Sequence, residues 1–304
     1  MIHSAESRPS NWGRWGDDDQ RGAANLATPE VTRAAAQAVS TGIVISLADE
    51  VRRDRVPIAP ARNPVTHLMS MDGGDFAAGF AMPGSDHGVA DDYMFIACQG
   101  TSHVDALCHL WYDRRLYNDF SPDRVRSYGA TRLGIENLVH LVSRGILLDV
   151  AAWRGVPHLE DKDRIGADEL QEICRAKGIR LRPGDVVLVR TGWRLVHDLD
   201  PTRYHASSPG ITFDAARWLA RQDIAAVGAD NIAVEVMDSP HSFADDGPAP
   251  ECHKLLIRDC GVYLFELLNL EDLAANDAVE FMFVAAPLRI TGGAGSPVNP
   301  LAIL

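Results

Sequence analysis

The segment from Gln99 to His109 contains side chains whose types and spacing suit metal chemistry. If its centre is extended, alternate side chains share one face and lie about 6.5–7 Å apart. These side chains are Gln99, Thr101, His103 and Asp105. An imidazole nitrogen beside a carboxylate oxygen suits Zn²⁺ or Mn²⁺ better than Ca²⁺ or Mg²⁺. The alternative is that His103 and Asp105 form a buried, hydrogen-bonded pair. For an isolated motif of this kind, that interpretation is the favoured one, because buried polar groups usually have hydrogen-bond partners.

A second histidine–carboxylate pair lies far downstream. Glu266 interrupts an otherwise apolar run over residues 262–268. Because burial of a lone carboxylate costs several kcal/mol, this side chain is expected to be paired, hydrogen-bonded or metal-bound. His253 falls in a helix predicted over residues 248–260, on a face that it shares with apolar side chains. A lone histidine there is more often a core residue, but two polar pairs in apolar surroundings make a metal site the simpler interpretation.

The cysteines offer a different nucleophile, which the sequence does not favour. Five cysteines are scattered along the chain, and no CxxC motif occurs. This pattern is typical of reduced, buried thiols rather than of a disulfide framework. Cys98, Cys108 and Cys252 lie near the metal-binding candidates, yet each has large apolar neighbours, so core packing is the favoured interpretation. The GxSxG motif of serine hydrolases and the GxGxxG motif of dinucleotide-binding proteins are also absent from the sequence.

Bulk composition limits the possible partners and the location of the protein. The chain has 304 residues and a formal net charge of −13, which argues against binding to nucleic-acid phosphates. No apolar run reaches the roughly 20 residues needed to cross a bilayer. The N-terminus lacks an apolar stretch typical of a signal peptide. We therefore expect a cytoplasmic protein with a small-molecule substrate and neither nucleic acid nor membrane as a partner.

The elements that position these residues are predicted from periodicity and from helix and turn signals. Residues 1–27 are expected to form an ordered surface arm, and Thr28 to cap a helix that stops at Gly42. The glycine-rich stretch 70–92 is predicted to be a long loop, and residues 93–98 to hold the following motif rigidly. Strands are predicted at 43–51, 101–105, 145–150, 185–191, 224–228, 262–268 and 279–290, and further helices at 166–176 and 212–222. This alternation indicates an α/β fold.

Loops on either side of the motifs are expected to shape a pocket. These are residues 70–92 and residues 239–250. Spacing alone assigns no role to an individual residue in either loop.

The first motif resembles a known signature. Residues 99–109 read Gln-Gly-Thr-Ser-His-Val-Asp-Ala-Leu-Cys-His, which is similar to the His-x-Gly-Thr-His-x-Asp-x-x-x-His signature of the cyclase family. That family includes bacterial kynurenine formamidases and isatin hydrolases. The resemblance extends to residues 11–20, His253, 266–270 and 295–298. Both the opening segment and the length resemble a longer, poorly characterised branch of the family.

The resemblance implies a fold, a ligand set and an acid/base. The fold would be a single compact domain of the swivelling β/β/α type with a mixed sheet, spanning residues 1–304 and assembled as a homodimer or larger oligomer. His103 and Asp105 would be metal ligands. Asp105 would bridge to a second ion held by His253 and Glu266, and His109 would be the acid/base.

One position departs from the family signature. Counting back from His103, the first histidine of the signature is Gln99 here. A glutamine carbonyl can bind a hard cation but is a weaker zinc donor than imidazole, which favours Mn²⁺ or a single-metal site. Ser102 also stands where the family has none between threonine and histidine. If the signature is instead aligned on the Gly-Thr pair at residues 100–101, Cys98 takes the place of its first histidine.

These features together predict hydrolysis of an amide, lactam or ester bond by metal-activated water. His109 would take the proton of the water and return it to the leaving group. Thr101 is a candidate donor to the oxyanion, with a structural role equally open. One alternative is a metal-dependent lyase or isomerase acting on a small carbonyl compound. The other is a non-catalytic metal-binding protein.

Overall fold

The apolar runs of the second half of the chain form the centre of one sheet in a computed structural model, which describes residues 8–53, 62–80, 82–238 and 250–304. Four neighbouring strands are parallel and almost completely buried, as expected for strands covered on both faces. They are β7 (Leu141–Asp149), β9 (Val186–Arg190), β11 (Ala226–Ala229) and β12 (Tyr263–Glu266). Their carboxyl ends therefore meet at one edge of the sheet.

Antiparallel strands extend this parallel core on both sides. Within the described residues, nine strands pair in the order β1-β15-β13-β7-β9-β11-β12-β4-β14. The flanking strands are β1 (Val44–Ser46), β15 (Leu301–Ile303), β13 (Glu280–Ala285), β4 (His103–Asp105) and β14 (Gly295–Pro297). The predicted α/β fold with one mixed sheet is thus confirmed.

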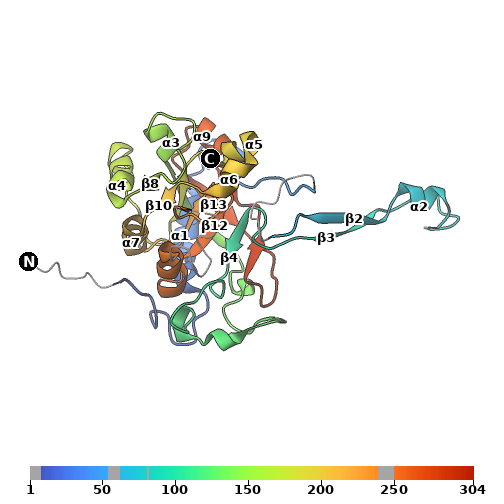
Figure 1. Ribbon diagram of the computed structural model, residues 1–304, viewed down its shortest axis with the longest axis horizontal. Helices are drawn as coiled ribbons and strands as arrows, with labels where there is room; N and C mark the ends of the chain where they lie inside the picture. The colour runs from blue at the N-terminus through green and yellow to red at the C-terminus, as the bar shows by residue number, and fades with distance from the viewer. Residues whose placement is uncertain (1–7, 54–61, 81, 239–249) are drawn as a thin grey trace, which may run out of the picture.

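Helices cover the sheet, and several begin where the sequence predicted. Thr28 caps α1 (Pro29–Ala36) by accepting a hydrogen bond from the backbone N–H of Val31, but this helix ends at Ala36 instead of running to Gly42. Figure 1 shows α4 and α7 together on one side of the sheet. The other helices are α3 (Val150–Trp153), α4 (Ala167–Ala176), α5 (Trp193–Leu199), α6 (Pro201–Ala206), α7 (Phe213–Arg221), α8 (Glu251–His253), the π-helix η5 (Lys254–Asp259) and α9 (Glu271–Ala275).

Short elements complete the connections. Two strands, β8 (Arg164–Ile165) and β10 (Gly210–Ile211), pair in parallel, and β5 (Val125–Arg126) pairs with β6 (Gly129–Ala130) in an antiparallel ribbon. The 3₁₀ turns are η1 (Gly22–Leu26), η2 (Tyr117–Asp119), η3 (Pro122–Arg124) and η4 (Ile135–Asn137).

The stretch predicted to be a loop over residues 70–92 forms part of a long hairpin, so that prediction was wrong. Strands β2 (Thr66–Met71) and β3 (Asp91–Phe95) pair in an antiparallel ribbon, and the short helix α2 (Gly73–Ala77) lies near its tip. Figure 1 shows this hairpin extending well away from the body. Residues 93–95 are exposed, so they do not hold the metal-binding motif rigidly as predicted. The sequence missed the hairpin because apolar residues lie on both of its faces and erase the expected alternation.

The N-terminal segment packs against the π-helix. The indole nitrogen of Trp12 donates a hydrogen bond to the carbonyl of Arg258, and the side-chain amide of Asn11 donates one to Cys260. This segment was predicted as an ordered arm over residues 1–27, of which residues 1–7 lie outside the described part of the chain.

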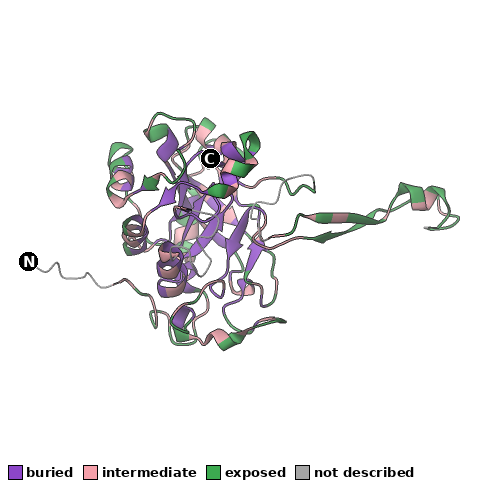
Figure 2. Ribbon diagram, in the orientation of Figure 1, coloured by how far each residue is buried: buried purple, intermediate pink, exposed green. Residues whose placement is uncertain are grey.

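The body of the protein and the hairpin differ in how far their residues are buried. In Figure 2 the buried residues gather on the central sheet, whereas the hairpin is exposed or half-buried along its length. None of the helices in the described part of the chain is long and apolar enough to cross a membrane.

Candidate metal centre

Strand pairing brings the two predicted motifs together. β4 lies between β12 and β14, and its register places His103 opposite Glu266 and Asp105 opposite Gly295. Because side chains alternate along a strand, His103 and Asp105 share the face predicted for them. His103 and Asp105 thus meet Glu266, which lies more than 160 positions later in the chain, at one end of the sheet.

Three side chains of this face converge in the interior. The Nε2 atom of His103 lies 3.6 Å from Asp105 Oδ1 and 3.4 Å from Glu266 Oε2, and all three residues are buried. Ligand atoms 2.0–2.2 Å from a tetrahedral ion are about 3.3–3.6 Å apart. Both distances from His103 Nε2 therefore fit ligands of one divalent ion, and the ligand atoms of all three residues lie within 4.8 Å of one another.

Hydrogen bonding leaves the converging atoms unsatisfied. His103 Nδ1 lies 2.8 Å from the carbonyl of Thr101, which can only accept, so Nδ1 carries the hydrogen and Nε2 faces the two carboxylates. Among the described residues, both carboxylate oxygens of Asp105 have no hydrogen-bond partner, and neither has Nε2 of His103. Burial alone would lower the pKa of His103, but Glu266 and Asp105 raise it. A positive charge at this point is therefore favoured, and a metal ion supplies one.

His253 joins the group through Glu266. Its Nε2 atom lies 3.2 Å from Glu266 Oε1, so the two oxygens of Glu266 face two different imidazoles. Burial would lower the pKa of His253, but the carboxylates of Glu235 and Glu266 raise it to about 10. The carboxylate between the two histidines is thus Glu266.

His109 lies at the more accessible side of the cluster. Its Nδ1 atom is 3.7 Å from Asp105 Oδ1, and its side chain is 28% exposed. Its ring centre lies 6.5 Å from that of His253. Burial lowers the pKa of His109 against the opposing effect of Asp105. A neutral imidazole beside the ligands and open to solvent can accept a proton, as an acid/base must.

Gln99 lies in the turn before β4 instead of on the strand. Its side-chain nitrogen is buried and has no hydrogen-bond partner among the described residues. A Cβ atom built on Gly295 would lie 2.6 Å from this nitrogen and 3.5 Å from Asp105 Oδ1, so the amide and the carboxylate border the same glycine. The absence of a side chain at Gly295 leaves room for both.

The cysteines near the cluster do not have reactive surroundings. Cys108 and Cys252 are buried, and burial raises the pKa of Cys108 to about 12. Burial also raises the pKa of Cys252 and of Cys98. Because the thiolate is the nucleophilic form, these values favour the packing role predicted for them.

Sequence reasoning missed Glu235, whose carboxylate contacts His253 Nδ1 at 2.5 Å. Like Glu266, Glu235 stands in an apolar stretch, residues 232–237, and is buried. The same argument about buried carboxylates could have singled it out.

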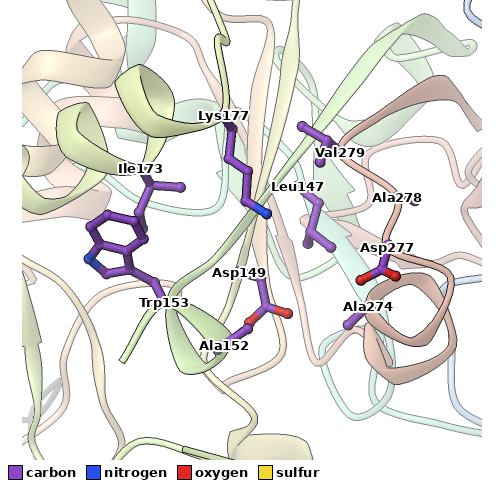
Figure 3. A pocket seen from close by; sticks show the side chains of 10 residues that line it. All are labelled: Leu147, Asp149, Ala152, Trp153, Ile173, Lys177, Ala274, Asp277, Ala278 and Val279. Atoms are coloured by element: carbon purple, nitrogen blue, oxygen red, sulfur yellow. The ribbon is translucent and has the colours of Figure 1, made fainter. Parts of the chain in front are cut away.

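A separate pocket of about 310 Å³ lies near the carboxyl end of β7 and contains none of these residues. Figure 3 shows the side chains of Lys177, Asp149 and Asp277 around this pocket. Asp149 already caps α3 and pairs with Arg190, so its charge is satisfied by the fold. This pocket lacks the unsatisfied buried ligands that distinguish the metal centre.

Comparison with known proteins places the chain in a family. The cyclase family model matches residues 45–236, which is more than half of the chain. The chain belongs to the cyclase family. An isatin hydrolase from Roseibium aggregatum is 32% identical over 220 residues, which cover 70% of this chain and 74% of the relative.

Solved structures agree with this assignment. A crystal structure described as a novel cyclase has a TM-score of 0.88 and 39% identity, and the match covers 97% of this chain and all of that one. Isatin hydrolase A from Ralstonia solanacearum has the same fold, with a TM-score of 0.63, 22% identity, and coverage of 90% of this chain and 97% of the other. A structure described as a potential metal-dependent hydrolase with cyclase activity has a TM-score of 0.55 at 20% identity, covering 86% and 98%.

Proposed function

We propose that this protein is a metal-dependent hydrolase that cleaves an amide, lactam or ester bond of a small molecule. The observation that carries the proposal is the buried group of His103, Asp105 and Glu266, whose ligand atoms lie within 4.8 Å of one another. The relative that is an isatin hydrolase supports the hydrolytic reaction and the class of bond.

The donor set indicates which groups hold the metal. We assign His103, Asp105 and Glu266 as the ligands of one ion. His253 and Gln99, which lie beside them, are assigned as further ligands. Nitrogen and carboxylate donors suit Zn²⁺ or Mn²⁺, and an amide in place of an imidazole shifts the preference toward Mn²⁺. When bound, such an ion lowers the pKa of water and polarises a carbonyl.

The remaining residues handle the proton and the substrate. His109 accepts a proton from water at its free ring nitrogen and returns it to the leaving nitrogen or oxygen. Its neutral form is favoured by burial, and its Nδ1 atom lies 3.7 Å from Asp105 Oδ1. Ala106 and Leu107, which follow Asp105 in the chain, are buried and apolar.

We further propose that the protein forms a homodimer or larger oligomer through the hairpin of β2 and β3. A two-stranded ribbon is marginally stable by itself, and this one exposes Leu68, Tyr93 and Phe95 by 61%, 72% and 69%. Apolar exposure of this kind favours a protein partner, and a second copy of the chain supplies an identical apolar ribbon.

Metal analysis combined with activity tests the proposed function. Purified protein is expected to contain stoichiometric Mn²⁺ or Zn²⁺ and to hydrolyse members of a panel of amides, lactams, lactones and esters. The exposed His140 provides a control, since His140→Ala removes an imidazole that is not part of the buried cluster. Full metal occupancy in His103→Ala would contradict the assignment of the site, and metal without turnover on the whole panel would contradict hydrolysis.

A further inference from the structure

Glu235 is a buried carboxylate directed at a proposed metal ligand. It follows β11 on the loop that begins at Asp230, and it is 7% exposed. Its Oε1 atom lies 2.5 Å from His253 Nδ1 and accepts a hydrogen bond of 3.0 Å from the backbone N–H of the same residue. Its other oxygen accepts one of 3.1 Å from the backbone N–H of Cys252. One carboxylate thus fixes both the main chain and the side chain at the end of α8.

These contacts determine which nitrogen of His253 faces the cluster. An ionised carboxylate only accepts hydrogen bonds, so Nδ1 carries the hydrogen and Nε2 is directed at Glu266, 3.2 Å away. His103 has the same tautomer, but its Nδ1 partner is the neutral carbonyl of Thr101. A carboxylate partner makes the opposite nitrogen of an imidazole a more basic ligand than a carbonyl does.

The backbone around Glu235 is held in an unfavourable conformation. Val234 has a φ of 59°, a region that a β-branched residue rarely adopts, and Leu267, directly after Glu266, has a φ of 57°. Residues in such conformations persist where the surrounding structure enforces them, and they are concentrated at functional sites.

Asn231 holds both of these residues. Its side-chain oxygen accepts a hydrogen bond of 2.7 Å from Val234 N–H, and its backbone carbonyl accepts one of 2.9 Å from Leu267 N–H. Asn231 itself is completely buried. A single residue therefore sets the positions of the loop that presents Glu235 and of the turn that follows Glu266.

We propose that Glu235 is a positioning residue that fixes the tautomer and orientation of His253 for metal binding. Asn231, through its hydrogen bonds to Val234 and Leu267, aligns Glu235 with Glu266. This inference rests on the proposed metal centre. The helix that carries His253 continues directly into the π-helix η5. Helices of this type are rare in proteins, and those that occur are often found at functional sites.

Metal affinity of Glu235 variants tests the proposal without relying on turnover. Zn²⁺ and Mn²⁺ dissociation constants are measured by chelator competition for the wild type, Glu235→Gln and Glu235→Ala. Loss of such a partner typically lowers metal affinity about 10–100-fold, so Glu235→Ala is expected to lose this much and Glu235→Gln less. The glutamine variant keeps the size and one acceptor, which guards against a failure of the alanine variant to fold.

Asp230→Asn is the matched control. Asp230 is a buried carboxylate at the start of the same loop, and it accepts hydrogen bonds from Thr191 and Gly192 instead of a histidine. Its variant is expected to lose stability while its metal affinity stays that of the wild type. Equal losses of affinity in Asp230→Asn and Glu235→Gln would overturn the proposal, because they would reflect loosening of the loop alone.

Nitrogen NMR of histidine-labelled, metal-free protein separates this inference from the proposed function. Because the pKa of His253 is raised to about 10, both of its ring nitrogens carry a proton at neutral pH without metal. The wild type is expected to show the Nδ1 proton shifted downfield by the carboxylate of Glu235, and Glu235→Gln is expected to lose that shift. If the wild type binds no metal, the proposed function fails whatever the NMR shows. If it binds metal and Glu235→Ala binds equally tightly, this inference fails while the proposed function stands.

Discussion

The metal centre and the hairpin are neighbours in the sequence, yet they are incomplete in opposite ways. The centre on β4 and β12 buries polar atoms that lack partners among the described residues. The hairpin of β2 and β3 exposes apolar side chains such as Tyr93 and Met94. Only seven residues, 96–102, separate the end of β3 from the start of β4.

This contrast underlies a separate proposal for each region. Buried carboxylates and a histidine lone pair that face one another are unfavourable until a cation is shared among them. Exposed apolar surface is unfavourable in water until another surface covers it. We propose that a metal ion completes one region and that a second copy of the chain completes the other. Each can be removed separately by experiment.

The largest effect is expected from removal of a ligand in the centre. In His103→Ala and Glu266→Ala, metal affinity and kcat/KM are each expected to fall by roughly 10³-fold or more, since even outer partners of metal ligands contribute 10–100-fold. Elemental analysis and steady-state kinetics measure the two quantities. Retention of the metal with loss of activity would move both residues from metal binding to another role.

A smaller effect is expected when the acid/base is removed. His109→Asn keeps a polar side chain, so metal content is expected to stay that of the wild type while kcat falls about 10²–10⁴-fold. The acid limb of the pH–rate profile, which reports the proton on His109, is expected to disappear as well. A variant with wild-type kcat would exclude His109 from proton transfer.

A shift in metal preference is expected at Gln99. Gln99→His restores an imidazole donor, and Zn²⁺ affinity relative to Mn²⁺ is expected to rise about 10-fold or more. Chelator competition with each metal measures the ratio. An unchanged ratio would show that the side chain at position 99 does not reach the ion, in agreement with its place in the turn before β4.

The smallest effect on the centre is expected from changes in the hairpin. Leu68→Ser combined with Phe95→Ser removes exposed apolar surface while leaving the strand pairing of Thr66 with Phe95 intact through the backbone. Sedimentation velocity is expected to show a shift from oligomer to monomer, with metal content unchanged. A wild-type protein that is already monomeric at micromolar concentration would refute the assembly proposal.

The sequence predicted that His103, Asp105 and Glu266 would come together, because burial restricts polar residues so strongly. Glu266 in an apolar run and the alternation of His103 with Asp105 each pointed to a specific face of a strand. The sequence alone did not show how these residues come to be close in space. Their proximity depends on the pairing of β4 with β12, which are adjacent and antiparallel. The order of the strands is set by pairing between distant segments, and the periodicity of the sequence does not indicate which segments pair.

The hairpin and the turn at Gln99 were harder to predict for a different reason. A ribbon that extends from the body has no buried face, so its residues follow no alternating pattern and resemble a loop. The contact of Glu235 with His253 also depends on a loop in which Val234 has a positive φ and donates its backbone N–H to the side chain of Asn231. Local sequence rules disfavour that conformation, and they fail where the fold overrides them.

The two left-handed residues beside the carboxylates have a consequence for the evolution and engineering of this protein. Each such conformation costs on the order of 1–3 kcal/mol, so the fold gives up stability at Val234 and Leu267. Glycine tolerates this conformation without that strain. Selection for heat resistance alone would accordingly favour glycine at these two positions, and the more robust proteins obtained would hold their carboxylates less firmly. Thermal tolerance and catalytic competence are thus opposed at the same two peptide units.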